Sequence, residues 1–398
     1  MTKTSLKLYL EINNSHFIFF VIKKDKQDNF NLEYKLVIPI TGLDNNRICD
    51  YDKFHSLVKE NIYLIEQKLN FIFKEIILIL ESFNPLFINL SGFKKLNGTQ
   101  ILRENITYIL NSIKSYVSEI ETKKTILHIF NSKFNLDNKK IENLPIGLFG
   151  DFYSHELSFS LINSNDFKNL ENIFNNCNLK IKRILLKSFI EGANTCDKNK
   201  DIETFFQIKL NKDKSKIFFF ENSALKFEQE FQFGTDIIIK DVSKVTSLKT
   251  ETVEKILDNI NFNDEKIEED LIEKDLFNDE AYRKIKKKLI YEIILARVKE
   301  ISEIILFKNL NIKHFIKISR NIFLEINNSY KQDNTKNIYE LTFSIQSGPK
   351  LVFLDNLPDE NMLKTAEKIV HFGWKKEAIP LSVAKKSILV KFFEAIFG

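Results

Sequence analysis

Residues 6–22 have the sequence Leu-Lys-Leu-Tyr-Leu-Glu-Ile-Asn-Asn-Ser-His-Phe-Ile-Phe-Phe-Val-Ile. Apolar side chains dominate both ends of this segment, and the mostly polar run 11–15 separates them. The pattern predicts two strands joined by a turn. A strand at 32–40, a helix at 51–69 and a short apolar strand at 75–80 are expected to follow. Three strands, a helix and a buried strand are typical of an α/β layer.

The next part of the chain has a different pattern, which we interpret as a small α+β subdomain inserted into the first domain. After it, the chain is expected to return to the first domain through a helix and a strand. The predicted segments are a strand at 85–90, a helix at 103–120, strands at 125–130 and 155–162, a helix at 167–177 and a strand at 180–186.

The second half repeats the order of the first, after a polar boundary at 191–200. The predicted segments are strands at 203–210, 216–221 and 225–231, helices at 236–245, 250–259 and 280–306, strands at 315–326 and 341–354, and a helix at 362–372. This recurrence indicates two related α/β domains around a cleft. We place the first domain at 1–83 and 164–194, the inserted subdomain at 84–163, the second domain at 195–379, and a linker with a terminal helix at 380–398.

Composition limits the class of protein. The chain has 398 residues and is 43% hydrophobic, which is enough for two domains with sizeable cores. Its net charge of +5, from 59 basic and 54 acidic residues, argues against a general nucleic-acid binder. The six histidines are scattered, and neither a GxSxG nor an HExxH motif is present, so we expect no catalytic set and no metal site.

The location of the protein is also constrained. Cys49, Cys177 and Cys196 stand far apart, which favours a reducing compartment without a disulfide framework. The N-terminus does not have the pattern of a signal peptide, and no apolar run reaches the length of about 18 residues that a membrane span needs. We therefore expect a cytoplasmic protein with at most a peripheral membrane attachment.

The C-terminal segment 385–398 predicts an amphipathic helix. Its apolar face carries large aromatic side chains, and lysines lie at its start and on its polar side. Such a helix can lie in the surface of an anionic membrane; the alternative is a terminal helix docked on its own domain. The membrane-binding candidates are Lys385, Lys386, Ile388, Leu389, Lys391, Phe392, Phe393, Ile396 and Phe397.

Several segments carry a resemblance to a known family. They are Thr-Ile-Leu-His-Ile-Phe at 125–130, Leu-Pro-Ile-Gly-Leu-Phe-Gly-Asp at 144–151, Glu-Leu-Ser-Phe-Ser-Leu-Ile at 156–162, the run 178–193, the segments 221–225, 289–299 and 369–373, and Gly234. The family that they resemble is the actin-like bacterial division protein FtsA. The resemblance implies an α/β actin-like fold, of the actin, Hsp70 and sugar-kinase type. That fold would have two domains, an inserted α+β subdomain and a C-terminal amphipathic helix.

The resemblance also implies two glycine-rich hairpins that bind ATP and Mg²⁺, and here the chain departs from the pattern. The first hairpin has Glu11 followed by Asn13 in place of glycine; the second has Asn211 and Lys214, with Gly234 further along. Asparagine tolerates positive φ and can still turn the chain, but it cannot bring bare backbone as close to a phosphate as glycine does. We therefore expect weak or absent ATP turnover. Lys209 and Lys216 stand where the resemblance implies two carboxylates. These lysines either neutralise phosphate or fill the cleft by pairing with Glu11 or Asp213.

The partners are also implied by the resemblance. The C-terminal peptide of FtsZ would bind near Glu292 and Arg297, which alone would be interpreted as a solvated charged face. The inserted subdomain would support self-association. We favour an adaptor that attaches the FtsZ ring to the cytoplasmic side of the inner membrane. The alternatives are a working ATPase of the same family and an actin-like scaffold of another membrane system, such as pilus assembly.

Overall fold

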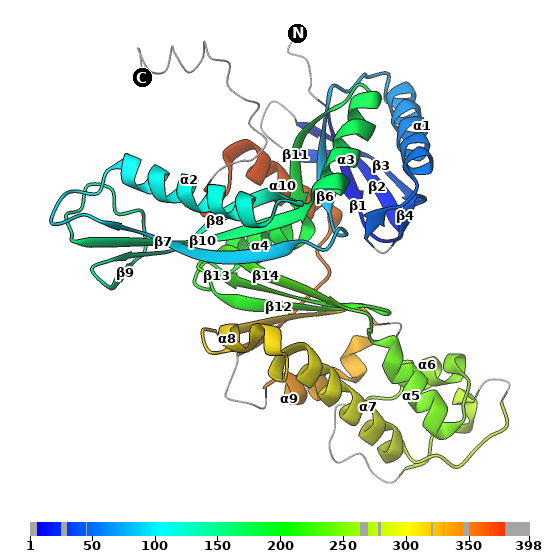
Figure 1. Ribbon diagram of the computed structural model, residues 1–398. Helices are drawn as coiled ribbons and strands as arrows, with labels where there is room; N and C mark the ends of the chain where they lie inside the picture. Colours follow the sequence, from blue (N-terminus) through cyan, green and yellow to red (C-terminus); the bar gives the residue numbers. More distant parts are fainter. Residues whose placement is uncertain are drawn as a thin grey trace. The chain divides into compact units, whose positions relative to one another are not determined.

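The computed structural model describes residues 6–24, 30–44, 46–262, 270–277, 280–319, 321–328, 330–344 and 350–378 (Figure 1). The predicted membrane-binding residues of segment 385–398 lie outside the described residues. Among those described, no helix combines the length and the apolar character needed to cross a membrane.

The chain divides into two compact units. The first unit comprises Met1–Lys198, Asn222–Lys226 and Pro358–Gly398, and the second comprises Asn199–Glu221 and Phe227–Leu357. Short pieces from the middle and the end of the chain thus belong with the first unit, which the sequence pattern did not predict.

The main sheet of the first unit has the strand order β11-β6-β1-β2-β3. Strand β1 pairs parallel with β6 and antiparallel with β2, and β11 pairs parallel with β6. The strands are β1 (Leu6–Ile12), β2 (His16–Lys24), β3 (Phe30–Pro39), β6 (Glu75–Leu80) and β11 (Lys180–Leu186), with a separate short pair, β4 (Leu43–Asp44) and β5 (Arg47–Ile48). All but the first residue of β6 are buried, as expected for a strand covered on both faces.

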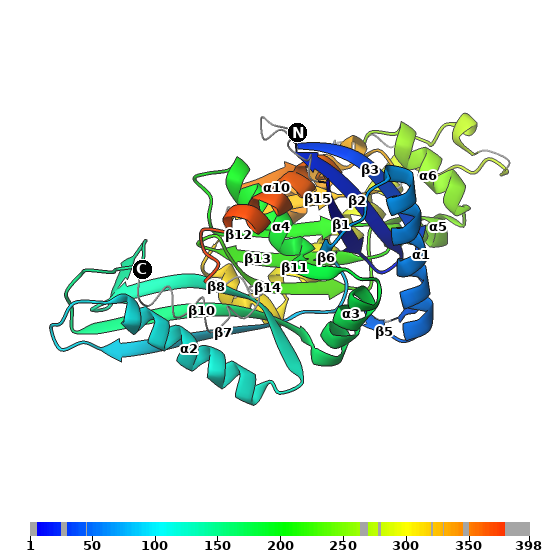
Figure 2. The ribbon, with the colours of Figure 1, turned by 90° about the horizontal axis from the view of Figure 1, so that it is seen from above.

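Four helices pack around this sheet (Figures 1 and 2): α1 (Tyr51–Leu69), α3 (Ser164–Asn176), α4 (Lys187–Lys198) and α10 (Asp359–Phe372). Helix α1 shows how the sequence sets the bounds. The Asp50 side chain accepts a hydrogen bond from the Lys53 amide at the start, and Asn70 adopts a left-handed conformation at the end. Its buried face carries Phe54, Val58 and Ile62 at helical spacing.

The inserted subdomain is a four-stranded sheet in the order β7-β10-β8-β9, with one helix, α2 (Arg103–Ile120), packed on it. The strands are β7 (Leu86–Lys95), β8 (Lys124–Leu136), β9 (Lys139–Ile141) and β10 (Phe152–Asn163), all antiparallel to their neighbours. Gly92 lets α2 lie close to β7, because a Cβ there would be 2.6 Å from Ile109 and 2.8 Å from Ile113.

The segment 374–378 fastens the end of the described chain to this unit. The Trp374 indole donates a hydrogen bond to the Ser223 carbonyl at 2.8 Å. The buried Glu377 carboxylate pairs with Arg183 of β11 and lies 2.9 Å from the Nδ1 of His128 of β8. One carboxylate thereby links the main sheet, the inserted subdomain and the residues that precede the predicted tail.

The sheet of the second unit has the order β14-β13-β12-β15-β16. Its topology matches the main sheet of the first unit: β12 pairs antiparallel with β13 and parallel with β15, and β15 pairs parallel with β16. The strands are β12 (Phe205–Leu210), β13 (Ser215–Glu221), β14 (Ala224–Phe231), β15 (Asn321–Ile326) and β16 (Lys350–Leu354). The recurrence of strand order expected from the sequence is thus present in the fold.

The α-helices of the second unit are α5 (Asp236–Thr246), α6 (Thr250–Asn259), α7 (Lys287–Ser302), α8 (Lys313–Ile316) and α9 (Lys336–Ser344). Its short helical turns are Lys274–Leu276, Leu310–Ile312 and Gln332–Asn334, and a π-helical turn, Glu303–Phe307, continues α7. A single apolar core joins the helices to the sheet through residues such as Ile208, Ile239, Ile294 and Leu324.

Three segment predictions are wrong. The polar boundary predicted at 191–200 contains the division between the two units, after Lys198, although most of that segment is the end of α4. The helix predicted at 280–306 begins at Lys287, because Leu271 forms a β-bridge with Lys286. The strand at 315–326 begins at Asn321, after α8. The strand at 341–354 overlaps α9, whose Tyr339 and Phe343 face the core. Short apolar runs fit helix or strand equally well, so packing decided these cases.

Candidate functional site

The candidate site of the first unit lies where its three parallel strands end. In open α/β sheets, ligands bind beyond the carboxyl ends of the strands. Strand β1 is followed by Asn13, β6 by Glu81, and β11 by Lys187, the first residue of α4. The topology therefore places a hairpin, a carboxylate and an ammonium group at one edge of one sheet.

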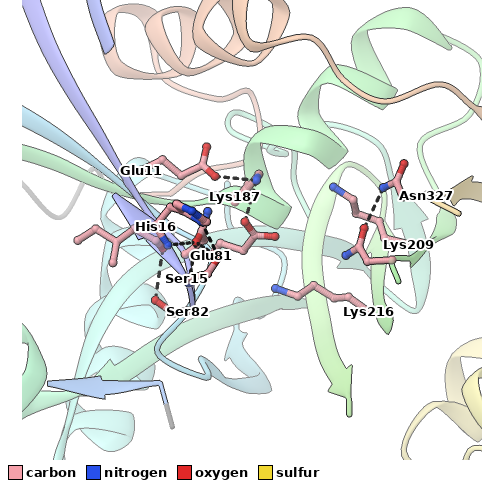
Figure 3. A network of polar contacts seen from close by, with 12 residues as sticks. Glu11, Ser15, His16, Glu81, Ser82, Lys187, Lys209, Lys216 and Asn327 are labelled. Carbon is pink, nitrogen blue, oxygen red and sulfur yellow. Dashed lines mark hydrogen bonds and ion pairs between the residues drawn. The ribbon is translucent and has the colours of Figure 1, made fainter. Parts of the chain in front are cut away.

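Lys187 lies between two carboxylates at this edge (Figure 3). Its Nζ is 2.8 Å from Glu11 Oε1 and 2.7 Å from Glu81 Oε2. Glu191, one turn further along α4, also acts on Lys187 electrostatically and is buried. The Glu11 side chain is 3% exposed, so its charge needs a partner inside the protein.

The pKa values of the pair follow from burial and from each other. Burial raises the pKa of the Glu11 carboxyl above its usual value, and the charge of Lys187 opposes that shift. For Lys187, burial alone would lower the pKa, but Glu81 and Glu11 outweigh it and hold the pKa well above its usual value. Lys187 is thus a cation at any physiological pH.

The first hairpin satisfies its own amide groups. The Asn13 side-chain oxygen accepts hydrogen bonds from the backbone N–H of Ser15 at 2.9 Å and of His16 at 2.7 Å. The Asn13 amide donates to the His16 carbonyl at 3.2 Å. Two donors that a phosphate would need are therefore already engaged. Asparagine does not turn the chain here through a positive φ, because neither Asn13 nor Asn211 has one.

In the second hairpin, which lies in the second unit, the backbone hydrogen-bonding groups are engaged in a different way. The carbonyl oxygens of Asn211 and Lys212 accept hydrogen bonds from the amides of Thr235 and Asp236, each at 2.9 Å. Those amides lie at the start of α5, the position where a helix can bind an anion. Gly234 permits this contact, since a Cβ there would lie 2.1 Å from the Asn211 oxygen. The helix terminus is thus occupied by the hairpin's own carbonyls.

The lysines of the second hairpin are paired within the second unit. Lys209 lies 3.5 Å from Glu325, its register partner on β15, and Lys216 lies 2.9 Å from Glu228. The ammonium of Lys214 lies 3.0 Å from Glu230. Within its own unit, Glu11 has Lys187 as a partner. Pairing of the second-hairpin lysines with Glu11 or Asp213, one of the two expectations from the sequence, stays a prediction.

Two important residues, Lys187 and Glu325, were missed in the sequence, although a signal for one of them was present. The hexapeptide Leu-Glu-Ile-Asn-Asn-Ser occurs at 10–15 and again at 324–329. Its first copy places Glu11 at the end of β1, and its second places Glu325 at the end of β15. The Asn327 amide group donates to the Asn211 side-chain oxygen at 2.8 Å (Figure 3). Lys187 left no comparable signal, because its partners are far away in sequence.

The predicted partner-binding residues lie on α7 of the second unit. Glu292 is exposed, whereas the Arg297 guanidinium is engaged by Asp241 of α5 and by Glu300, which is 2.6 Å away. Arg297 therefore fastens α7 to α5, and Glu292 remains available at the surface.

Comparison with known proteins supports the fold. No family model and no curated protein matches this chain. Among solved structures, the PilM-PilN type IV pilus biogenesis complex is similar with a TM-score of 0.51 and 8% identity, over 93% of this chain and 96% of that chain. MreB5 of Spiroplasma citri bound to AMPPNP has a TM-score of 0.45 and 10% identity, over 93% and 97%.

The ethanolamine utilization protein EutJ from Carboxydothermus hydrogenoformans has a TM-score of 0.42 and 8% identity, over 94% of this chain and 91% of that chain. At such identities the likeness concerns the fold alone. The chain has the actin-like ATPase fold, and the predicted fold class is confirmed; membership of the FtsA family stays a prediction.

An actin-like ATPase fold implies a site for ATP and Mg²⁺, and the residues of this chain do not fit one. Asn13 caps the amides of the first hairpin, and the start of α5 is bonded to the second. The carboxylates Glu11 and Glu81 hold an ammonium group at hydrogen-bond distance. In each unit taken by itself, a phosphate would meet hairpin or helix-start donors that are already bonded, so we derive no reaction step at either position.

Proposed function

We propose that this protein is an actin-like scaffold that attaches a protein assembly to a membrane without nucleotide turnover. The observation that carries the proposal is Lys187, held between Glu11 and Glu81 where the fold would otherwise offer an open ligand site. A fold whose ligand positions are filled by its own side chains retains its surfaces, and these suit binding and assembly.

In its finer form, the proposal is a cell-division adaptor of the FtsA type, located on the cytoplasmic side of the inner membrane. The resemblance of segments such as 178–193 supports it, and so does the pattern of segment 385–398. Phe392 and Phe393 would enter the acyl boundary, while Lys385 and Lys386 would meet anionic headgroups.

The partners proposed for this adaptor are the C-terminal peptide of FtsZ and further copies of the chain. Exposed Glu292 on α7 offers a carboxylate to a basic peptide side chain. The inserted subdomain exposes a group of large apolar side chains, as a self-association surface would. They include Phe93, Leu102, Tyr108, Tyr116, Leu148, Phe149 and Phe152.

A second candidate is a scaffold of pilus assembly. The TM-score of 0.51 to the PilM-PilN type IV pilus biogenesis complex favours it, and that likeness spans almost the whole of both chains. In that case the C-terminal segment would dock on a protein partner. A working ATPase is the third candidate, and the occupied donors of both hairpins argue against it.

Co-sedimentation with anionic vesicles tests the membrane attachment. The full chain should sediment with the vesicles, and a chain ending at residue 379 should stay in solution. The matched variant Phe392→Glu/Phe393→Glu, in the full chain, should also stay in solution, because it places charge on the apolar face. If full chain and truncation behave alike, the membrane scaffold is excluded.

The partner is tested separately, by fluorescence anisotropy with a labelled FtsZ C-terminal peptide. Saturable binding that weakens at least about tenfold in Glu292→Lys would support the division adaptor. Vesicle binding without peptide binding would favour the pilus-type scaffold.

A further inference from the structure

Two carboxylates contact one ammonium group in the first unit, and a third acts on it electrostatically. Glu11 comes from β1, Glu81 follows β6, and Glu191 lies in α4, one turn after Lys187. The two closest oxygens are 2.8 Å and 2.7 Å from the Lys187 Nζ, whose side chain is 19% exposed. Each of these four groups is delivered by a different strand end or helix position, so the cluster forms only in the folded unit.

Converging carboxylates at low exposure need a cation, since burying unpaired negative charge costs several kcal/mol. Carboxylate oxygens are the ligands of hard divalent cations, and Mg²⁺ commonly uses one or two of them together with waters. Within the described part of the chain, no three acidic, histidine or cysteine side chains are arranged to hold a metal ion. Here Lys187 provides the positive charge.

We propose that the Lys187 ammonium is the resident cation of this strand edge and takes the place of a bound divalent cation. The first unit then reaches its complete folded form without any ligand. This inference deepens the nucleotide-independent part of the proposed function, but it holds whether or not the chain binds a membrane.

The second unit carries the same solution independently. The repeated hexapeptide brings Glu325 to the end of β15, and Lys209 of the neighbouring parallel strand lies 3.5 Å from it. The two lysines come from unrelated positions, a helix start and a strand. Each glutamate of the repeat therefore has a lysine cation from its own unit.

Chemical rescue of Lys187→Ala tests the proposal. The substitution leaves the carboxylates and a space shaped for an alkylammonium group. Thermal unfolding of the variant is measured with propylammonium chloride, MgCl₂ or CaCl₂, and with NaCl at matched ionic strength. Propanol serves as the neutral analogue of propylammonium. Lys182→Ala is the matched control, because Lys182 pairs with Glu75 at 3.2 Å on the surface of the same unit.

We expect Lys187→Ala to lower the Tm of the first unit by at least about 5 °C. Propylammonium or Mg²⁺ should restore at least about half of that loss, while propanol and NaCl should not. Wild type and Lys182→Ala should respond to none of them beyond the effect of salt. An unchanged Tm in Lys187→Ala, or equal rescue by propanol or NaCl, would overturn the proposal.

A second variant keeps the inference testable if Lys187→Ala does not fold. In Glu11→Gln/Lys187→Met, one negative and one positive charge are removed together, so most of the lost stability should return. If the double variant also fails to fold, or is less stable than Lys187→Met alone, the coupling between the two groups is absent and the proposal fails. Vesicle binding by the same variants reports on the proposed function separately.

Discussion

In both units the same hexapeptide places a buried glutamate at the carboxyl end of a strand. The lysine that pairs with this glutamate comes from a different kind of position in each unit. In the first unit, Glu11 pairs with Lys187 at the start of α4, and Lys187 also pairs with Glu81. In the second unit, Glu325 pairs with Lys209 on the adjacent strand. A helix start can reach two strand ends at once, whereas a lysine within a strand faces its register partner.

The hairpins differ as well. Asn13 closes the first by accepting hydrogen bonds from two backbone amides with its side chain. The second is closed from outside, since its carbonyls bond the start of α5. Asparagine in the two hairpins therefore has two structural outcomes, and local sequence alone does not distinguish them.

The largest expected effect is the loss of stability on substitution of Lys187, compared with substitution of Lys209. Lys187→Met leaves Glu11 and Glu81 without their shared cation and should cost about 3–5 kcal/mol of stability. Lys209→Met should cost less, because the Glu325 carboxylate keeps a hydrogen bond from Asn327 at 3.2 Å. Urea unfolding of both variants measures the difference. Equal costs would mean that the second carboxylate at Lys187 contributes nothing.

The loss of stability at acid pH should depend on His155, which lies in the inserted subdomain and outside both lysine–glutamate sites. Burial lowers the pKa of His155 in β10 to about 4, and its Nε2 lies 2.9 Å from the Asn131 side-chain oxygen. The unfolded chain binds the proton near pH 6.5, so stability is full above that pH and falls as pH drops toward 4. The loss should reach about 3 kcal/mol.

Unfolding of His155→Leu at pH 7 and at pH 4.5, compared with wild type, measures this contribution. The variant should lose less stability on acidification than wild type does. If both lose the same amount, the acid sensitivity belongs to other groups, and the carboxylate clusters of the strand edges become the first to examine.

Gly234→Ala should destabilise the contact between the second hairpin and α5, without affecting the lysine–glutamate site of the first unit. The added methyl group would meet the backbone oxygens of Asn211 at 2.1 Å and Lys212 at 2.5 Å. The hairpin must then move away from α5, at a cost of about 1–3 kcal/mol. Asp213→Ala, an exposed change on the same turn, should leave the melting temperature unchanged. Hydrogen exchange at Thr235 and Asp236 should rise only in the glycine variant.

The smallest expected effect concerns the asparagines. Asn13→Ala releases the amides of Ser15 and His16 and should cost about 1 kcal/mol, as loss of a capping side chain does elsewhere. The Asn211 side-chain oxygen bonds only another side chain in the described contacts, at 2.8 Å, so Asn211→Ala should cost less. Thermal unfolding of the two variants ranks them. The reverse order would contradict the assignment of a backbone-capping role to the Asn13 side chain and not to the Asn211 side chain.

Adding Mg²⁺ and ADP to wild type should change none of these stabilities, beyond the effect of salt. A ligand at a hundredfold its dissociation constant would add about 2.7 kcal/mol, which thermal unfolding detects readily. A clear rise in the Tm would show that the donors of the hairpins can be released, and it would favour the ATPase candidate.

The sequence by itself determined the elements whose signals are local. The helices Tyr51–Leu69 and Arg103–Ile120 and the strands Glu75–Leu80 and Lys180–Leu186 have the bounds that periodicity predicts, because caps and apolar faces lie within each segment. The order of strands in the two halves likewise predicted two sheets of one topology. The sequence also shows asparagine at positions 13 and 211, where the resemblance implies glycine.

The tertiary structure alone decided which groups pair with the side chains near those positions. Lys187 contacts Glu11, from which it is separated by 176 positions in sequence, and Lys209 contacts Glu325 through strand register. It also decided that α4 and α9 are helices, since their apolar residues find a core only when the sheets are assembled. Ion pairing and burial depend on distances that no local pattern contains, so the chemistry of both edges emerges only in the folded units.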